Sequence, residues 1–166
     1  GQGMDPQRRY YFPITGYNFR LTNVACAMLC AQLGRSEQII ERRRQIFAVY
    51  REQLANIPGI GFQSVASWAE PAPWLFCITV NENEYGCSRN RLMDLLAENG
   101  IETRPFFMAL HQLPPFRLES KRRFEHLPVT DELSQRGMNL PTYTGLSLDN
   151  IHYIASIINK FCHKAI

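Results

Sequence analysis

Residues 16–23, Gly-Tyr-Asn-Phe-Arg-Leu-Thr-Asn, place polar side chains directly before a helix rich in small residues. Asn18 offers an amide donor and Arg20 a permanent positive charge. The free N–H groups at the start of a helix capped by Thr22 or Asn23 would add a favourable dipole. These residues could therefore form an anion site. From the spacing alone we favour the alternative interpretation, in which Asn18 makes a turn, Arg20 is a solvated charge and Thr22 is only a cap.

A second candidate site combines Arg-Pro-Phe-Phe at 104–107 with Leu-His-Gln at 110–112. The guanidinium of Arg104 could pair with a phosphate, while aromatic rings and the imidazole of His111 could stack on a base or a sugar ring. Alternatively, Phe106 and Phe107 belong to the core and its rim, and Arg104 holds a loop. For the two phenylalanines we favour this second interpretation.

The cysteines and histidines argue against disulfides and metal catalysis. Five cysteines without a Cys-x-x-Cys pair make a poor disulfide framework and are typical of a reducing compartment, so a cytoplasmic location is expected. Cys26 and Cys30 lie four residues apart among alanines, where small core-filling thiols are expected rather than a metal or redox pair. The four histidines are scattered, with no His-Glu-x-x-His spacing, and no metal site is predicted.

Charge and hydropathy favour an ordinary globular domain. The chain has 166 residues, of which 45% are hydrophobic and 20% charged, and a net charge of +3. Basic clusters at 8–9, 42–44 and 121–123 are interleaved with acidic or apolar residues, which is typical of solvated helix faces rather than of nucleic-acid binding. No segment reaches the roughly 18 apolar residues of a membrane span, and no signal peptide opens the chain. Neither nucleic acid nor a membrane is expected as a partner.

Hydrophobic periodicity and helix-breaking residues predict the helices and strands of the first half of the chain. After an irregular aromatic arm, a helix is predicted over 23–33, ending near Gly34. A longer helix is predicted over 36–56, stopped by Pro58-Gly59. One apolar stripe should face its core; the stripe comprises Ile39, Ile40, Phe47, Tyr50 and Leu54. The continuous aromatic and β-branched run at 74–80 predicts a strand buried on both faces.

The second half repeats the alternation of helix and strand. Ser88 should cap a helix that carries three leucines and closes at Asn99-Gly100. A strand is predicted over 101–107, in which Pro105 indicates an edge strand or the end of a strand. Residues 110–127 are expected to be loop-rich. Thr130 should cap a short helix ending at Gly137, and Ser147 should cap the last helix, with its isoleucines on the buried side. The predicted fold class is α+β, a small sheet packed with helices.

The order and spacing of several motifs carry a resemblance to a known family. They comprise residues 1–11, 16–23 and 25–33, then 100–107 and 110–112, and finally Leu140-Pro141-Thr142-Tyr143 with Leu146-Ser147 to the end. Together they resemble the sugar aminotransferases related to DegT and StrS, fold-type I enzymes that use pyridoxal phosphate to aminate keto-sugars on nucleotide carriers. The resemblance covers nearly the whole chain and implies the fold of the small C-terminal domain of these enzymes.

The resemblance also implies roles for single residues. In such enzymes an asparagine of the Gly-Tyr-Asn-Tyr/Phe-Arg segment reaches from the neighbouring subunit of a homodimer to the cofactor phosphate, a role that falls on Asn18. Arg20 matches the family's arginine, whose task is either ligand contact or an internal ion pair. Arg104 and His111 match a loop at the mouth of the active site, where substrate binding is expected. The departure at Met108-Ala109 leaves the identity of the sugar open.

The lysine that carries the cofactor in this family has no evident counterpart here. Lys121 lies in a basic run, Lys160 near the end of an amphipathic helix and Lys164 in the tail, so none is expected to be a desolvated Schiff-base amine. No catalytic residue is therefore assigned to this chain, which alone is expected to be inactive. In the complete enzyme, an amino-acid donor would load the cofactor, which then aminates a keto-sugar.

These expectations divide the chain into two regions and leave more than one function open. Residues 1–35 would form an interface arm and helix leading from a missing large domain, and 36–166 the small α+β domain with its long connecting helix. The chain is expected to be a fragment of a longer enzyme. A stand-alone regulatory or interaction module without catalysis, or a small nucleotide-binding domain, stays open as the alternative.

Overall fold

The computed structural model describes residues 3, 5, 7, 10, 11, 13–123 and 126–162. It divides into two compact units, Gly1–Gln38 and Ile39–Ile166. The basic pair at 8–9 and part of the motif at 1–11 lie outside the described residues, as do Phe12, His163 and Lys164.

The first unit consists of an N-terminal arm, residues 13–22, and the helix α1, Asn23–Leu33. The prediction of this helix is confirmed, with Thr22 as its cap: the Thr22 hydroxyl accepts from the backbone N–H of Ala25 at 3.3 Å. No residue of α1 is buried. Cys26 and Cys30 are exposed, so the expectation that they fill a core is wrong for this chain, because nothing in the unit packs over them.

The long helix α2, Ser36–Leu54, ends two residues before the predicted boundary. Its buried residues are Ile46, Tyr50 and Leu54. Ile40 is exposed, contrary to the predicted stripe, because only the C-terminal part of α2 faces the hydrophobic core. The rim of that core includes Phe47. The turn after α2 contains Gly59 at φ +76°, where an added Cβ would lie 2.5 Å from the backbone nitrogen of Tyr85.

Four short strands form an antiparallel sheet in the order β1-β2-β4-β3. They are β1 (Ile60–Phe62), β2 (Phe76–Val80), β3 (Arg104–Pro105) and β4 (Gly137–Leu140). The predicted strand at 101–107 shrinks to two residues, and Pro105 lies on an edge strand as expected. Strands β1 and β4 were not predicted, since three or four residues that include glycine show no alternation of polar and apolar side chains.

The strand register separates two faces of the sheet. Phe76 pairs with Leu140 and Ile78 with Met138, and these four side chains are buried. Cys77, one residue along, pairs with Asn139 and is only half-buried. The expectation of burial on both faces is therefore wrong: β2 alternates, because helices cover one face of an antiparallel sheet.

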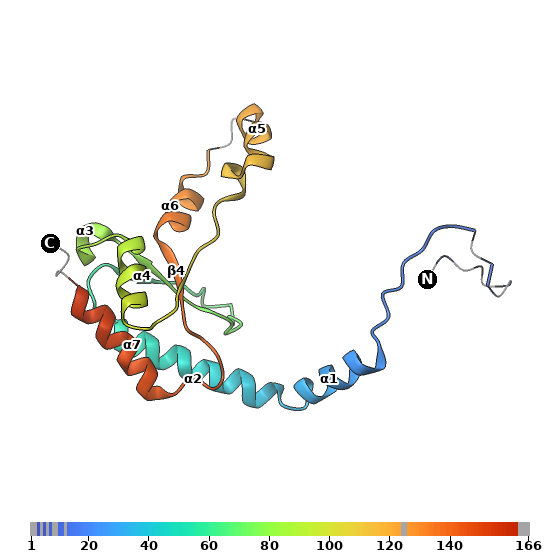
Figure 1. The fold of residues 1–166 in the computed structure, drawn as a ribbon, viewed down its shortest axis with the longest axis horizontal. Coiled ribbons are helices and arrows are strands. Elements are labelled where there is room, and N and C mark those ends of the chain that lie inside the picture. The colour runs from blue at the N-terminus through green and yellow to red at the C-terminus, as the bar shows by residue number, and fades with distance from the viewer. Residues whose placement is uncertain are drawn as a thin grey trace. The chain divides into compact units, whose positions relative to one another are not determined.

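Helices α4 (Arg89–Glu98) and α7 (Leu148–Phe161) complete the core as predicted. Ser88 caps α4 and Ser147 caps α7, each hydroxyl accepting a backbone N–H from the first turn. Both helices bury one apolar face, and α7 lies alongside α2 (Figure 1). The short helix α3, Glu82–Tyr85, joins β2 to α4. The α+β fold class, a small sheet packed with helices, is confirmed.

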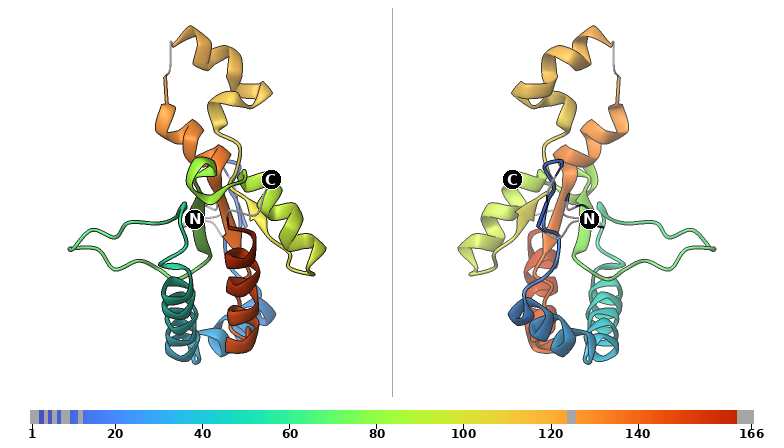
Figure 2. Two further views of the ribbon diagram at one scale, coloured as in Figure 1. Left: turned by 90° about the vertical axis from the view of Figure 1, so that its left-hand side faces the viewer. Right: turned by 90° about the vertical axis from the view of Figure 1, so that its right-hand side faces the viewer.

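Residues 106–136, the α5–α6 segment, project from the sheet (Figures 1 and 2). A loop-rich stretch was expected over 110–127, but the segment holds a 3-10 turn, Leu110–Gln112, and helix α5, Pro114–Arg122. Helix α6, Pro128–Arg136, begins at its proline, so the prediction that Thr130 caps it is wrong; Gly137 ends it as predicted. Proline suits the first turn of a helix, because the backbone N–H groups there have no hydrogen-bond partner within the helix. The prolines that begin α5 and α6 were not predicted to start helices.

Two buried tyrosines tie the helices to the rest of the core. Tyr50 of α2 stacks on Phe76 with ring centroids 4.9 Å apart and donates its hydroxyl to the Pro141 carbonyl at 3.0 Å. Tyr85 donates to the carbonyl of Ile158 at 2.6 Å. That carbonyl belongs to the last turn of α7, where no helical N–H follows to bond it. Each hydroxyl thus satisfies a polar group at the end of an element.

Replacing Tyr85 by phenylalanine should remove the hydrogen bond and keep the packing. We expect Tyr85→Phe to lower the free energy of unfolding by about 1–2 kcal/mol, because a buried carbonyl loses its partner. Urea titration followed by circular dichroism measures the change. Tyr143→Phe is the matched control, because the Tyr143 hydroxyl has no hydrogen-bond partner within the described residues. An equal loss in both variants would contradict this account.

Stability should also fall at alkaline pH. Burial raises the pKa of Tyr50 and of Tyr85 above the ordinary value of about 10. The unfolded chain therefore releases these protons first, and stability that is full below about pH 10 is lost as the pH rises further, by up to about 1.4 kcal/mol per pH unit for each tyrosine. Urea midpoints between pH 8 and 11 test this, and Tyr85→Phe should reduce the slope; an unchanged slope would refute the assignment.

Candidate functional site

The arm residues predicted to bind an anion form one local cluster. The Oδ1 atom of Asn18 accepts from the backbone N–H of Arg20 at 3.1 Å and from its Nε–H at 3.4 Å. Arg20 has no ion-pair partner among the described residues, so it engages Asn18 rather than an acid. Both residues are exposed.

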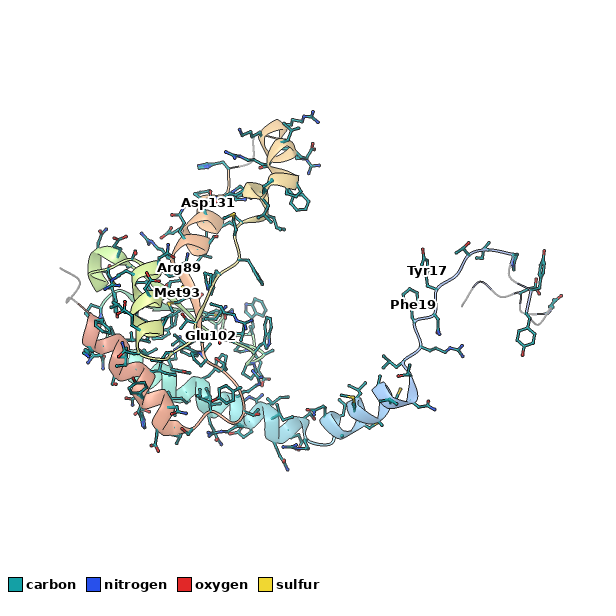
Figure 3. All side chains as sticks on the ribbon, in the orientation of Figure 1. Tyr17, Phe19, Arg89, Met93, Glu102 and Asp131 are labelled. Carbon is teal, nitrogen blue, oxygen red and sulfur yellow. The ribbon has the colours of Figure 1, made fainter. Side chains whose placement is uncertain are left out.

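These hydrogen bonds orient the amide of Asn18. With Oδ1 occupied, the Nδ2 donors point away from Arg20, and they have no hydrogen-bond partner within the described residues. Two exposed aromatic side chains flank the asparagine: Tyr17 and Phe19, with ring centroids 5.9 Å apart (Figure 3). The arm thus presents a fixed amide donor and a guanidinium beside apolar rings, which suits a phosphate attached to an organic group.

A cleft of about 700 Å³ lies in the second unit, where the start of β3 and the end of β4 meet α7. We call it the Tyr143 cleft. Its volume is within the range of small-molecule sites. Arg104 lines it, with an NH2 atom 3.6 Å from Oε1 of Glu102, and both side chains are largely exposed. These two residues carry the only charges in the lining that the structure describes.

Three aromatic side chains line the same cleft: Trp74, Tyr143 and Tyr153. Contacts from neighbouring residues hold the backbone of Trp74 and the side chains of the two tyrosines. Arg43 of α2 donates to the carbonyl of Trp74 at 2.5 Å, and the Tyr153 hydroxyl donates to the carbonyl of Asn99 at 3.2 Å. An added Cβ at Gly145 would meet the Tyr143 ring at 3.5 Å, so this ring lies against the glycine.

Two asparagines add side-chain amides to the polar lining. Asn139 accepts from the thiol of Cys77 at 3.1 Å, which leaves its Nδ2 donors without a partner in the described part of the chain. The side chain of Asn150, in the first turn of α7, likewise has none there. The lining of the cleft therefore combines side-chain amides, aromatic rings and one guanidinium.

His111 does not line this cleft, so the structure separates two residues that were predicted together. Its Nε2 atom lies 2.8 Å from Oδ1 of Asp131, and Gln112 donates to the same oxygen. Asp131 thereby joins the 3-10 turn to α6. Figure 3 shows Asp131 in the α5–α6 segment, away from Glu102 at the cleft. The assignment of His111 to substrate stays a prediction.

The two phenylalanines of the motif differ in their surroundings. Phe106 is half-buried against Gly137, where an added Cβ would lie 2.1 Å from the ring. Phe107 is almost completely exposed. One phenylalanine therefore packs on the sheet and the other does not, and neither lines the Tyr143 cleft.

Other candidate chemistry is sparse in the described part of the chain. No group of three or more histidine, cysteine, aspartate or glutamate side chains there is placed to hold a metal ion. Lys121 and Lys160 are exposed. No helix within the described ranges is long and apolar enough to cross a membrane.

The shared acceptor Asp131 generates a prediction for the α5–α6 segment. Asp131→Ala removes both contacts, which should cost the local structure about 1–2 kcal/mol after allowance for partial exposure and speed amide exchange roughly 5- to 30-fold. Hydrogen exchange read by mass spectrometry over 110–136 measures this. Asp94→Ala is the control, since this exposed carboxylate of α4 has no hydrogen bond or ion pair within the described residues. Unchanged exchange in the Asp131 variant would contradict the prediction.

Residues 1–159 match the DegT/DnrJ/EryC1/StrS aminotransferase family. The GDP-perosamine synthase of Vibrio cholerae is 35% identical over 161 residues, which are 96% of this chain and 42% of that protein. The structure of DesI in the presence of its TDP-sugar product is 28% identical, with a TM-score of 0.81 over 92% of this chain and 38% of that one. The PLP-form of the putative sugar aminotransferase Spr1654 from Streptococcus pneumoniae, at 20% identity, shares the fold with a TM-score of 0.83 over 99% of this chain and 42% of that one.

The chain thus spans less than half the length of these relatives. The match nevertheless extends over nearly all of its own residues, from the arm to the last helix. The chain belongs to the DegT/DnrJ/EryC1/StrS aminotransferase family.

Proposed function

We propose that this chain forms the C-terminal portion of a pyridoxal-phosphate-dependent aminotransferase that acts on a nucleotide-linked keto-sugar. The observation that carries the proposal is the family match over residues 1–159. Relatives named as a GDP-perosamine synthase and as DesI with a TDP-sugar product support a nucleotide-sugar substrate. An amino-acid donor would be the second substrate.

The N-terminal arm fits the phosphate of this cofactor. The Nδ2 donors of Asn18 are unpartnered within the described residues, and Arg20 holds the amide through its oxygen. A phosphate oxygen would accept from this amide, and the guanidinium beside it would favour the negative charge. When bound, pyridoxal phosphate supplies the electron sink for moving an amino group.

The exposed apolar surface of the first unit supports a homodimer. Tyr17 and Phe19 of the arm and Val24, Met28 and Leu33 of α1 are all exposed. Side chains of this kind on one segment mark an interaction surface. We infer that residues 1–35 form an interface arm and helix, that 36–166 form the small domain with its connecting helix, and that Asn18 serves the site of the neighbouring subunit.

Asn18 provides the test of this function. In the complete enzyme, Asn18→Ala should weaken cofactor retention by roughly 1.5–3 kcal/mol, about ten- to a hundredfold, because one charge-assisted hydrogen bond is lost. Absorbance titration with pyridoxal phosphate measures the affinity. Asn18→Asp keeps the oxygen that Arg20 contacts but replaces the donor with a carboxylate oxygen. If Asn18 served only the turn, the aspartate variant would retain the cofactor like the wild type, and the role would be wrong.

The same variant tests whether the site is shared. Asn18→Ala subunits are mixed with subunits that lack the cofactor-bearing lysine. If Asn18 acts across the dimer, one composite site of each hybrid carries both lesions and the other carries neither, so activity returns on mixing. Hybrid dimers that form without recovery of activity would place Asn18 in its own subunit or outside the site.

A further inference from the structure

The Tyr143 cleft combines aromatic rings, side-chain amides and a guanidinium in one lining. Aromatic rings of Trp74, Tyr143 and Tyr153 share it with the amides of Asn139 and Asn150. Arg104, on the edge strand β3, belongs to the same lining. We propose that the cleft binds a nucleoside diphosphate, with the base among the aromatic rings and the diphosphate at Arg104. The inference rests on the proposed function and assigns the nucleotide half of the substrate to these residues.

The aromatic groups favour a flat ligand. Trp74 is 70% exposed although its backbone is fixed by Arg43, and Tyr143 is 52% exposed although its ring lies against Gly145. The Tyr143 ring lies against Gly145 and the Tyr153 hydroxyl donates to the Asn99 carbonyl, so these two rings lose little conformational entropy when a base stacks on them. A stacked base would remove their apolar surface from water.

The amides favour a ligand with both donors and acceptors at its edge. The Nδ2 group of Asn139 and the whole side-chain amide of Asn150 have no partner within the described residues. An amide can pair with a base edge as donor and acceptor at once. A purely apolar ligand would leave these groups unsatisfied.

The guanidinium favours an anionic end. Arg104 engages Glu102 through a single contact of 3.6 Å, with more than three-quarters of each side chain exposed. Such a surface pair contributes little, so Arg104 can turn to a phosphate at small cost. Both charges of the described lining belong to the segment before and at β3, and β4 separates β3 from β2, the strand that Trp74 precedes. A nucleoside diphosphate likewise has a flat base at one end and a charged diphosphate at the other, with the sugar between them.

The two tryptophans of the chain give a direct test, since Trp74 lines the cleft and Trp68 does not. The 166-residue chain is titrated with GDP, and the two indole N–H signals are followed by NMR. We expect the Trp74 signal to shift saturably while the Trp68 signal, from a side chain that is 87% exposed, stays in place. Equal shifts of both signals, or none of Trp74, would overturn the proposal without any variant being made.

Variants then separate the two ends of the cleft. Tyr143→Ala should raise the Kd for GDP roughly 5- to 150-fold through lost stacking, with Trp68→Ala as the neutral control. Arg104→Gln should weaken GDP roughly 10- to 100-fold and leave guanosine unchanged, because only the diphosphate meets the guanidinium. A Tyr143 variant with wild-type affinity, or an Arg104 variant that weakens guanosine equally, would contradict the assignment.

The GDP titration and the Asn18 variants can refute their two proposals separately. Loss of cofactor in the Asn18 variants together with no GDP response at Trp74 would refute the cleft and leave the aminotransferase proposal standing. A GDP response at Trp74 in a complete enzyme that binds no pyridoxal phosphate would refute that function and leave a nucleotide-binding cleft.

Discussion

The pairing of β2 with β4 determines which side chains of the second unit are core and which are available to a ligand. Phe76 opposite Leu140 and Ile78 opposite Met138 point to the helices, so Cys77 and Asn139 point the other way. A shift of the β2–β4 register by one residue would turn Asn139 toward the core and Phe76 toward solvent. The register is extended past the ladder by Thr142, whose hydroxyl accepts from the N–H of Phe76 at 3.0 Å. The same contact fixes the start of the loop that carries Tyr143.

Helix α2 holds the rest of that loop. Tyr50 donates to the carbonyl of Pro141, and Arg42 donates to the carbonyls of Thr144 at 3.4 Å and Leu146 at 2.7 Å. Three carbonyls of one loop are thus satisfied by a single helix. Because Arg43 of the same helix holds Trp74, α2 supports both sides of the cleft entrance. A change in α2 would therefore move Tyr143 and Trp74 together.

Elements with local signals were predictable from the sequence, and those set by distant partners were not. Thr22, Ser88 and Ser147 cap helices where the sequence placed caps, because the capping hydroxyl bonds within its own first turn. Strand β4 has no such local signal. Its first residue, Gly137, leaves room for the ring of Phe106, which is 31 residues away in the sequence and lies where a Cβ would be. In the site, Arg104 and Asn18 were singled out by type and motif. Trp74 and Tyr143 were not, since they join Arg104 only through the sheet, whereas His111 is near Arg104 in sequence and bonds to α6 instead.

The distribution of perturbed titrating groups bears on what this chain contributes to a reaction. Burial raises the pKa of two core tyrosines and of the thiols of Cys77, Cys87 and Cys162, and it lowers the pKa of Arg89, which donates to the carbonyl of Gly137 at 2.6 Å. None of these six groups lines the Tyr143 cleft or belongs to the arm. Groups tuned for proton transfer commonly have shifted pKa values at the site itself. The shifted groups here serve the core, while the exposed side chains of Asn18, Arg20 and Arg104 and the half-buried amide of Asn139 are suited to binding and orienting anionic ligands.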